Sequence, residues 1–121
     1  MTRILYVDDE ADIREVAEMS LELDPEFEVR TCATGPEAIE QASAWQPDLV
    51  LLDVMMPEMD GPTVFAHLKA LPQTAAIPVV FITARTQASE VRGFEALGAR
   101  GVLAKPFDPM TLAIRVRELI D

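Results

Sequence analysis

The fold is set by the stretch Ile4-Leu5-Tyr6-Val7-Asp8-Asp9, in which four apolar residues run directly into two carboxylates. Three other apolar runs also end at a polar residue: Leu49–Leu52 at Asp53, Val79–Ile82 at Thr83, and Val102–Ala104 at Lys105. Continuous apolar runs that alternate with helical patterns are typical of strands in a parallel sheet covered on both faces. Ligands bind beyond the carboxyl ends of such strands, where the strand order reverses. We therefore expect these polar residues to meet at one edge of the sheet.

Segments with helical periodicity separate the runs in the first half of the chain. A first helix follows Asp9 and ends near Asp24-Pro25, and Phe27–Cys32 alternates in polarity as an edge strand does. Thr34-Gly35-Pro36-Glu37 has the spacing of a capping box and predicts a second helix that extends to about Trp45.

Three more helices are predicted in the second half. The third begins near Pro62, and the fourth, over residues 87–97, contains Gly93, which costs about 1 kcal/mol relative to alanine and makes this helix the weakest by propensity. The last helix has Asp108 as its N-cap and Pro109 at its first position. Five strands thus alternate with five helices, which predicts an α/β fold with a doubly wound, five-stranded parallel sheet.

Composition limits the classes of function. The 121 residues include 21 acidic and 10 basic side chains, and a formal net charge of −11 disfavours direct binding of nucleic acid, which needs a basic face. Cys32 is the only cysteine, so an internal disulfide is excluded and a reducing cytoplasm is the expected compartment. No apolar stretch approaches the roughly 20 residues that span a bilayer. We expect one soluble, cytoplasmic domain over residues 1–121, without an output domain.

The clustered carboxylates predict a metal site. Carboxylates forced together repel one another, so at neutral pH they take up a proton or a cation. Oxygen ligands without histidine or thiolate suit a hard ion such as Mg2+, which keeps several of its waters. Asp9 and Asp53 are the expected direct ligands, Asp8 would hold a water, and a backbone carbonyl at Met55 would complete the protein's share.

A carboxylate beside Mg2+ and a lysine is suited to accept a phosphoryl group. One oxygen of Asp53 would remain free as the nucleophile. Phosphoryl transfer needs positioning and positive charge around the equatorial oxygens. Mg2+ and Lys105 would supply that charge, while the Thr83 hydroxyl and the backbone amide of Ala84 would bind the remaining oxygens.

The chain resembles a response-regulator receiver domain from end to end. Four motifs carry the resemblance, each at the end of a predicted strand: Asp8-Asp9, then Asp53-Val54-Met55-Met56-Pro57-Glu58-Met59-Asp60-Gly61, then Thr83-Ala84, then Lys105-Pro106-Phe107. Each motif alone is weak, but all four in this order are a strong signal. Acidic residues before the first helix could also merely complement its dipole; their register with Asp53, Thr83 and Lys105 favours the site.

The resemblance implies a flavodoxin-like sheet in the order 2-1-3-4-5. It also implies a phosphorylation-controlled switch of a two-component system rather than a classical enzyme. A histidine kinase or histidine phosphotransfer protein would present phosphohistidine, Asp53 would accept the phosphoryl group with Mg2+, and the acyl phosphate would later be hydrolysed. Lys105 would contact the phosphate, and the Lys105-Pro106 bond would be cis. The downstream protein would dock on the face formed by the fourth helix, the fifth strand and the fifth helix of a monomer or weak dimer.

Three positions bear on how this chain would vary that scheme. The resemblance implies an aromatic switch residue three positions before Lys105, but the chain has Val102 there. Either the signal would travel by backbone movement of the loop from Ala84 to Ala88, or the activated state would differ little from the resting state. Met55 and Arg85 flank the site at positions that tune the loss of the phosphoryl group in the family.

Other readings remain open or are disfavoured. A docking module that signals without phosphate remains the alternative, although such a module would be expected to have lost the acceptor or the lysine. An aspartyl-phosphate hydrolase of the haloacid-dehalogenase kind would need Asp-x-Asp after the first strand. A flavodoxin-like cofactor protein would need a phosphate-binding loop where Asp8 and Asp9 stand. His67, the only histidine, is predicted to be an exposed side chain, and Met55, Met56 and Met59 are predicted to pack and anchor their loop.

Overall fold

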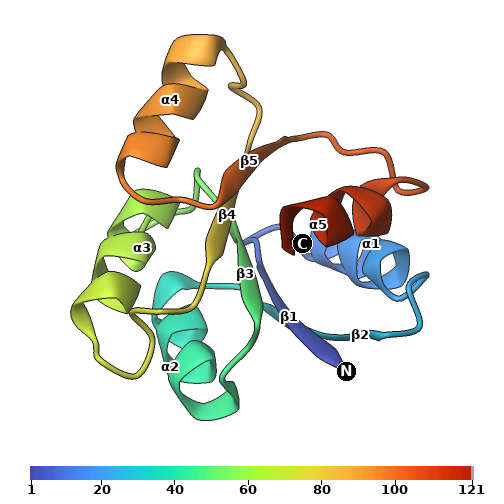
Figure 1. Ribbon diagram of the computed structural model, residues 1–121, viewed down its shortest axis with the longest axis horizontal. Coiled ribbons are helices and arrows are strands. Elements are labelled where there is room, and N and C mark those ends of the chain that lie inside the picture. Colours follow the sequence, from blue (N-terminus) through green and yellow to red (C-terminus); the bar gives the residue numbers. More distant parts are fainter. Residues whose placement is uncertain (121) are drawn as a thin grey trace.

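A computed structural model describes residues 1–120 of the chain. Its five strands and five helices alternate (Figure 1). The strands are β1 (Thr2–Val7), β2 (Phe27–Cys32), β3 (Leu49–Asp53), β4 (Val79–Thr83) and β5 (Gly101–Ala104). The helices are α1 (Ala11–Leu21), α2 (Gly35–Trp45), α3 (Gly61–Ala70), α4 (Ala88–Ala96) and α5 (Leu112–Ile120).

The strands form one parallel sheet in the order β2-β1-β3-β4-β5. This confirms the doubly wound, flavodoxin-like fold. In the register, Val7 pairs with Leu52 and Thr83 pairs with Ala104, so that the carboxyl ends of the four central and C-terminal strands line up. The strand order reverses between β1 and β3, which is where a ligand site is expected in such sheets.

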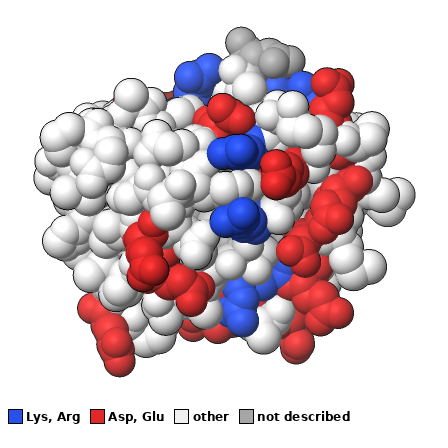
Figure 2. Space-filling view, turned by 90° about the horizontal axis from the view of Figure 1, so that it is seen from below, with Lys and Arg blue, Asp and Glu red and all other residues white. Residues whose placement is uncertain are grey.

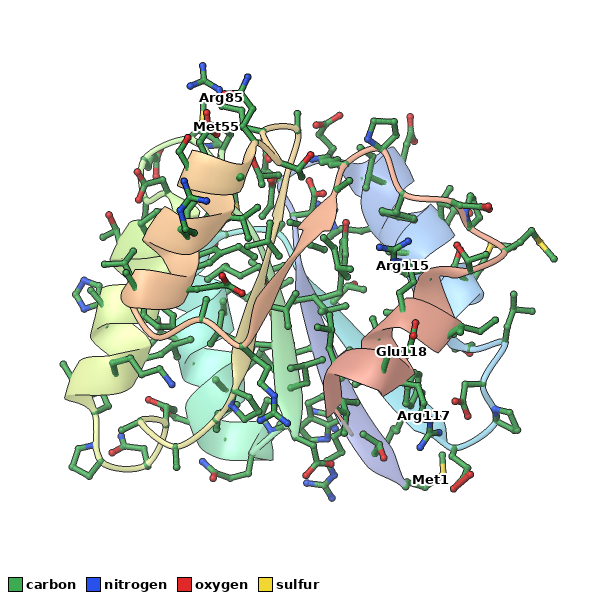
Figure 3. All side chains as sticks on the ribbon, turned by 45° about the horizontal axis from the view of Figure 1, so that its top comes forward. Met1, Met55, Arg85, Arg115, Arg117 and Glu118 are labelled. Atoms are coloured by element: carbon green, nitrogen blue, oxygen red, sulfur yellow. The ribbon has the colours of Figure 1, made fainter. Side chains whose placement is uncertain are left out.

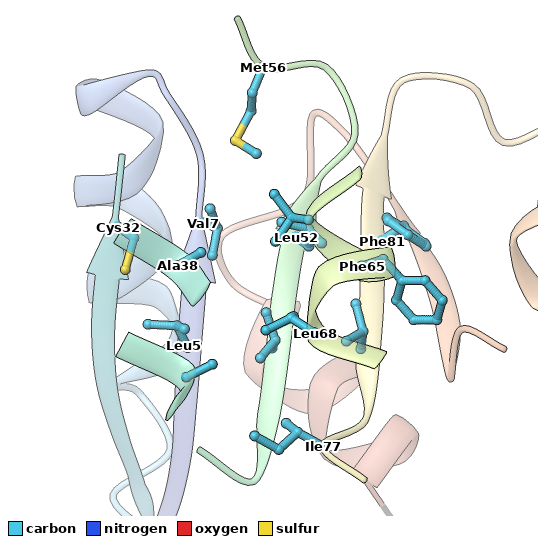
Figure 4. Close-up of a cluster of buried hydrophobic side chains, with 14 of the residues drawn as sticks. Leu5, Val7, Cys32, Ala38, Leu52, Met56, Phe65, Leu68, Ile77 and Phe81 are labelled. Carbon is cyan, nitrogen blue, oxygen red and sulfur yellow. The ribbon is translucent and has the colours of Figure 1, made fainter. Parts of the chain in front are cut away.

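Helices cover both faces of the sheet (Figure 1). On the face with α2 and α3, a buried cluster includes Leu5, Leu52, Phe65 and Phe81 (Figure 4). On the face with α1 and α5, a second cluster includes Ile4, Leu51, Ile82 and Leu112, together with Tyr6. Burial on both faces explains why these strands read as continuous apolar runs.

The predicted starts of α2 and α3 are confirmed, although the capping box at α2 forms only one of its two bonds. The Thr34 hydroxyl accepts the Glu37 N–H at 3.3 Å, while the Glu37 carboxylate accepts the N–H of Ala33 rather than that of Thr34. At α3, the Asp60 carboxylate accepts the Thr63 N–H at 2.9 Å. The next residue, Gly61, must be a glycine, because a Cβ at this position would lie 2.9 Å from Val54 Cα. Glycine therefore lets the helix start close to the end of β3.

The start of the last helix was predicted wrongly. α5 begins at Leu112, and not at Pro109. The Asp108 carboxylate accepts the N–H of Met110 at 2.9 Å, and its carbonyl accepts the N–H groups of Thr111 and Leu112, which closes a turn that leads into the helix. An aspartate that bonds the amide two residues ahead stabilises such a turn as readily as a helix start.

Charged side chains are mixed on one face of the molecule. On the face seen from below, Lys and Arg side chains lie in a narrow column with Asp and Glu on both sides, and no broad basic patch is visible there (Figure 2). Within residues 1–120, no helix has the length and hydropathy required to cross a membrane.

Candidate functional site

Two buried carboxylates stand side by side at the switch point of the sheet. Asp53 is the last residue of β3, and Asp8 follows the last residue of β1, one step past the Val7–Leu52 pair. Asp8 is fully buried and Asp53 is 3% exposed. Carboxylates this deep require hydrogen-bond donors or opposite charge.

Lys105 supplies that opposite charge. Its ammonium lies 3.0 Å from Asp8 Oδ2 and 3.2 Å from Asp53 Oδ2, and 3.4 Å from Glu10 Oε1. The Lys105-Pro106 peptide bond is cis, as the resemblance implied. One cation therefore bridges the ends of β1 and β3 from the end of β5.

Asp8 is held by more donors than Lys105. Its Oδ2 also accepts the hydroxyl of Tyr6 at 3.1 Å, and its Oδ1 accepts the N–H of Glu10 at 2.9 Å. The Asp8 carbonyl accepts Nη1 of Arg14 at 2.8 Å. Among residues 1–120, every buried side-chain nitrogen and oxygen has a hydrogen-bond partner, so the pocket is polar but internally satisfied.

The electrostatic balance leaves Asp53 less acidic than an ordinary aspartate. Burial, followed by the charge of Asp8, raises the pKa of Asp53 to about 6, although Lys105 and a backbone hydrogen bond from Met55 lower it. Burial alone would lower the pKa of Lys105, but its hydrogen bond to Asp8 and the charges of both aspartates raise the pKa above the ordinary lysine value. Lys105 therefore stays charged while Asp53 titrates near neutrality.

Thr83 ends β4 at the same edge. It is 5% exposed, and its hydroxyl oxygen accepts the N–H of Arg85 at 3.0 Å. Residues 84–89 are all exposed, so the chain that follows Thr83 lies at the surface. The side chains of Arg85 and Met55 point outward from this edge of the molecule (Figure 3).

The exposed rim of the pocket is acidic. Asp8, Asp9 and Glu10 can place one carboxylate oxygen each within 4.8 Å of one another, and Asp9 and Glu10 are exposed. Glu10 was not among the predicted site residues. The signal available in the sequence was only its position, directly after the Asp8-Asp9 pair.

Two further expectations concern the loops around the site. Met56 is buried and Met59 half-buried, as expected of loop anchors, but Met55 is 79% exposed, so the prediction that its side chain packs is wrong. Met55 directs its backbone and not its side chain toward Asp53. Val102 is half-buried and packs against the cluster on the α2–α3 face. His67 is exposed, as predicted.

The chain is similar to known response regulators over nearly its whole length. Residues 4–117 match the family model of the response regulator receiver domain. The response regulator PleD of Caulobacter vibrioides is 47% identical over 120 residues, which cover 97% of this chain and 26% of PleD. The DNA-binding dual master transcriptional regulator RpaA of Synechocystis is 38% identical over 121 residues, covering 99% of this chain and 49% of RpaA. The chain thus spans about a quarter to a half of the length of these curated relatives.

Solved structures of response regulators have the same fold as this chain. The chemotaxis response regulator CheY4 of Vibrio cholerae superimposes with a TM-score of 0.89 at 33% identity, over 98% of each chain. A response regulator from Chloroflexus aurantiacus gives a TM-score of 0.86 at 34% identity, over 98% of this chain and 97% of that one. The chain belongs to the response-regulator receiver domain family of two-component systems, whose general function is that of a phosphorylation-controlled switch. Receiver domains are regulatory phosphoacceptors rather than classical enzymes, and they generally bind Mg2+ at an acidic pocket.

Proposed function

We propose that Asp53 accepts a phosphoryl group from the phosphohistidine of a histidine kinase or a histidine phosphotransfer protein. The P–N bond of the donor breaks and the imidazole nitrogen keeps its electron pair, while a carboxylate oxygen of Asp53 forms the new P–O bond. Water later hydrolyses the acyl phosphate and restores the carboxylate. The observation that carries the proposal is the bridge of Lys105 to both Asp8 and Asp53, at 3.0 and 3.2 Å, directly at the end of β3.

The surrounding residues have distinct roles in this proposal. The Lys105 ammonium is already within hydrogen-bond distance of the Asp53 carboxylate, so it can follow the new negative charge. The Thr83 hydroxyl would exchange its contact with the Arg85 N–H for a phosphate oxygen, and the exposed N–H of Ala84 would bind another. These residues stand at the ends of β4 and β5, on the open side of Asp53.

The donor set of the rim fits Mg2+. Asp8, Asp9 and Glu10 offer carboxylate oxygens close to one another, with no nitrogen or sulfur ligand among them. Asp9 and Asp53 are the proposed direct ligands with the Met55 carbonyl, and Asp8 would act through a water because its oxygens already accept three donors. When bound, Mg2+ would neutralise the carboxylates and the charge of the transferring group.

The downstream partner is proposed to be a protein that docks on the face formed by α4, β5 and α5. The loop after Thr83 leads into α4, which has no buried residue and can therefore shift at low cost. Regulation through this face would need no contact with nucleic acid by the receiver domain itself.

Intact-mass measurement after incubation with acetyl phosphate and Mg2+ tests the acceptor. The wild-type chain should gain one phosphoryl group, and Asp53→Asn should gain none. Asp60→Asn is the matched control, because Asp60 belongs to the neighbouring loop, is exposed, and asparagine also serves as an N-cap. It should gain the group as the wild type does.

Each result has a definite meaning. A phosphoryl gain in Asp53→Asn would contradict the assignment of the acceptor. No gain in the wild type would contradict the phosphorylation proposal and support the phosphate-independent docking module instead.

A further inference from the structure

We propose that Tyr6 is a positioning residue for the acidic pocket: its hydroxyl keeps Asp8 in place independently of Lys105, and thereby sustains Mg2+ affinity. The inference rests on the Mg2+ site proposed above. It concerns a residue that lies below the pocket and touches neither the metal nor the phosphoryl group.

The contact is specific. Tyr6 is fully buried in β1, where it pairs with Thr31 of β2 on one side and with Leu51 of β3 on the other. Its hydroxyl donates to Asp8 Oδ2 at 3.1 Å, and this is the oxygen that Lys105 also contacts. Because an ionised carboxylate only accepts hydrogen bonds, the direction of the bond from Tyr6 to Asp8 is fixed.

The ring is held firmly enough to position its partner. Phe107, two residues past Lys105, meets the Tyr6 ring edge-on, with 6.4 Å between centroids and 78° between planes. Strands pair with β1 on both sides, so the backbone of Tyr6 cannot shift without breaking the sheet. Burial and the neighbouring Asp8 raise the pKa of Tyr6 above its ordinary value, so the hydroxyl remains a donor at any physiological pH.

Lys105 alone could not hold Asp8 through the phosphorylation cycle. Its ammonium is divided among Asp8, Asp53 and Glu10, at 3.0, 3.2 and 3.4 Å. In the proposed function it follows the charge on the phosphoryl group, and its contact with Asp8 then weakens. The Tyr6 hydroxyl and the Glu10 N–H are the donors that remain on the Asp8 carboxylate.

The competing explanation is that Tyr6 merely fills the core. Its neighbours in that cluster, such as Ile4, Leu51 and Leu103, are aliphatic and fill space without a polar atom. A buried hydroxyl costs free energy unless it is bonded, and the bond it makes in this structure is the one to Asp8. The two explanations differ in what Tyr6→Phe does, because phenylalanine keeps the ring and removes only the hydroxyl.

Calorimetric titration of the unphosphorylated protein with Mg2+ separates them. Outer-shell partners of a metal site typically contribute 10- to 100-fold in affinity. Because Asp8 would reach the ion through a water, Tyr6→Phe should have an effect at the low end of that range and weaken Mg2+ binding by about 10-fold. The matched control is Thr74→Val, which removes another fully buried hydroxyl, one that donates to the Leu68 carbonyl at 2.6 Å away from the site. Its Mg2+ affinity should equal that of the wild type.

The outcomes separate this inference from the proposed function. If the wild type fails to bind Mg2+, the metal site itself is wrong. If the wild type binds and Tyr6→Phe binds equally well or more tightly, only the role of Tyr6 is overturned.

A spectroscopic test avoids any variant of Tyr6. Tyr6 is the only tyrosine of the chain, so a 13C label on the phenol carbon gives a single NMR resonance. This resonance should move in Asp8→Asn, which lacks the ionised acceptor, and should stay in place when beryllofluoride mimics the phosphoryl group. A resonance that ignores Asp8→Asn, or that beryllofluoride shifts as far as Asp8→Asn does, would overturn the proposal.

Discussion

Two parts of the site differ in how firmly the fold holds them: a buried half at the ends of β1 and β3, and an exposed half formed by residues 84–97 after β4. At the ends of β1 and β3, Asp8 and Asp53 are buried and bridged by Lys105. At the end of β4, the chain runs into an exposed segment, residues 84–89, which includes the first two residues of α4, and α4 has no buried residue. Phe94 of α4 packs on Phe81 of β4, with 4.7 Å between ring centroids.

This contrast shows which part of the fold can act as a switch. Bistable segments come from the least stable parts of a fold, and a ligand shifts populations only by its unequal interaction with two states. The buried half can hold an acceptor in one geometry, while the half formed by residues 84–97 can change conformation at low cost.

The largest effect is expected from removing the cation of the buried half. Lys105→Met leaves two buried carboxylates without their counter-charge, which should lower the free energy of unfolding by about 3 to 5 kcal/mol in EDTA. Added Mg2+ should restore part of the loss. Denaturant titration with and without Mg2+ measures both.

Lys69→Met is the control for this loss. The Lys69 ammonium donates to the carbonyls of Ala75 and Ile77, at 2.9 and 3.1 Å, and no carboxylate bond is found for it among the described residues. The decrease in the free energy of unfolding should be smaller in Lys69→Met and should not change when Mg2+ is added. Equal losses in the two variants would contradict the account of the buried half.

The pH dependence of stability should be dominated by Asp53 in the absence of Mg2+. The pKa of Asp53 is about 6 in the folded state against an ordinary 3.8, mainly because of burial. Folding therefore favours the protonated form; this stabilisation is complete below about pH 4 and is lost as the pH rises through about 6. The free energy of unfolding of Asp53→Asn should exceed that of the wild type by up to roughly 3 kcal/mol at pH 8, and this difference should disappear below pH 4.

The stability difference between Asp60→Asn and the wild type should depend on pH in the opposite direction. Hydrogen bonds from Thr63 lower the pKa of Asp60, so its contribution is present at neutral pH and is lost as the pH falls through that lowered value. Unfolding free energies measured from pH 3 to pH 8 compare the two variants. An Asp53→Asn advantage that persists at pH 3 would show that burial of the charge is not its cause.

A smaller effect is expected from stiffening the exposed half. A Cβ at Gly93 meets no atom within 4 Å, so Gly93→Ala should stabilise α4 by about 0.5 to 1 kcal/mol. Hydrogen exchange in α4 should slow accordingly. Gly98→Ala is the contrasting variant, because Gly98 has φ of +108° and alanine there is strained. Slower exchange in both would contradict the backbone explanation.

The sequence predicted the parts of this molecule that depend on local pattern. Apolar runs buried on both faces identified the strands, and the cap at Thr34 is a local hydrogen bond that the Thr34–Glu37 spacing indicates. Because parallel strands end at the same edge, Asp8, Asp53 and Lys105 could be brought together before any coordinates were available.

Features that depend on the orientation of individual side chains were not predicted. The bond from Tyr6 of β1 to Asp8, just after the strand, depends on the carboxylate turning back toward the core. The turn at Asp108 competes with a helix start through the same kind of bond. Met55 could not be placed because exposure of one loop side chain depends on how its neighbours pack, with Met56 taking the buried position.

Hydrogen exchange with and without beryllofluoride tests the central contrast most directly. The buried half should change little beyond the site itself, because its donors and acceptors are already satisfied. The largest difference elsewhere should lie in residues 84–97, with little change in β5, where Val102 offers no aromatic side chain to rearrange. Uniform protection across the chain, or a change centred on α2, would contradict the account and point to a partner on the opposite side of the sheet.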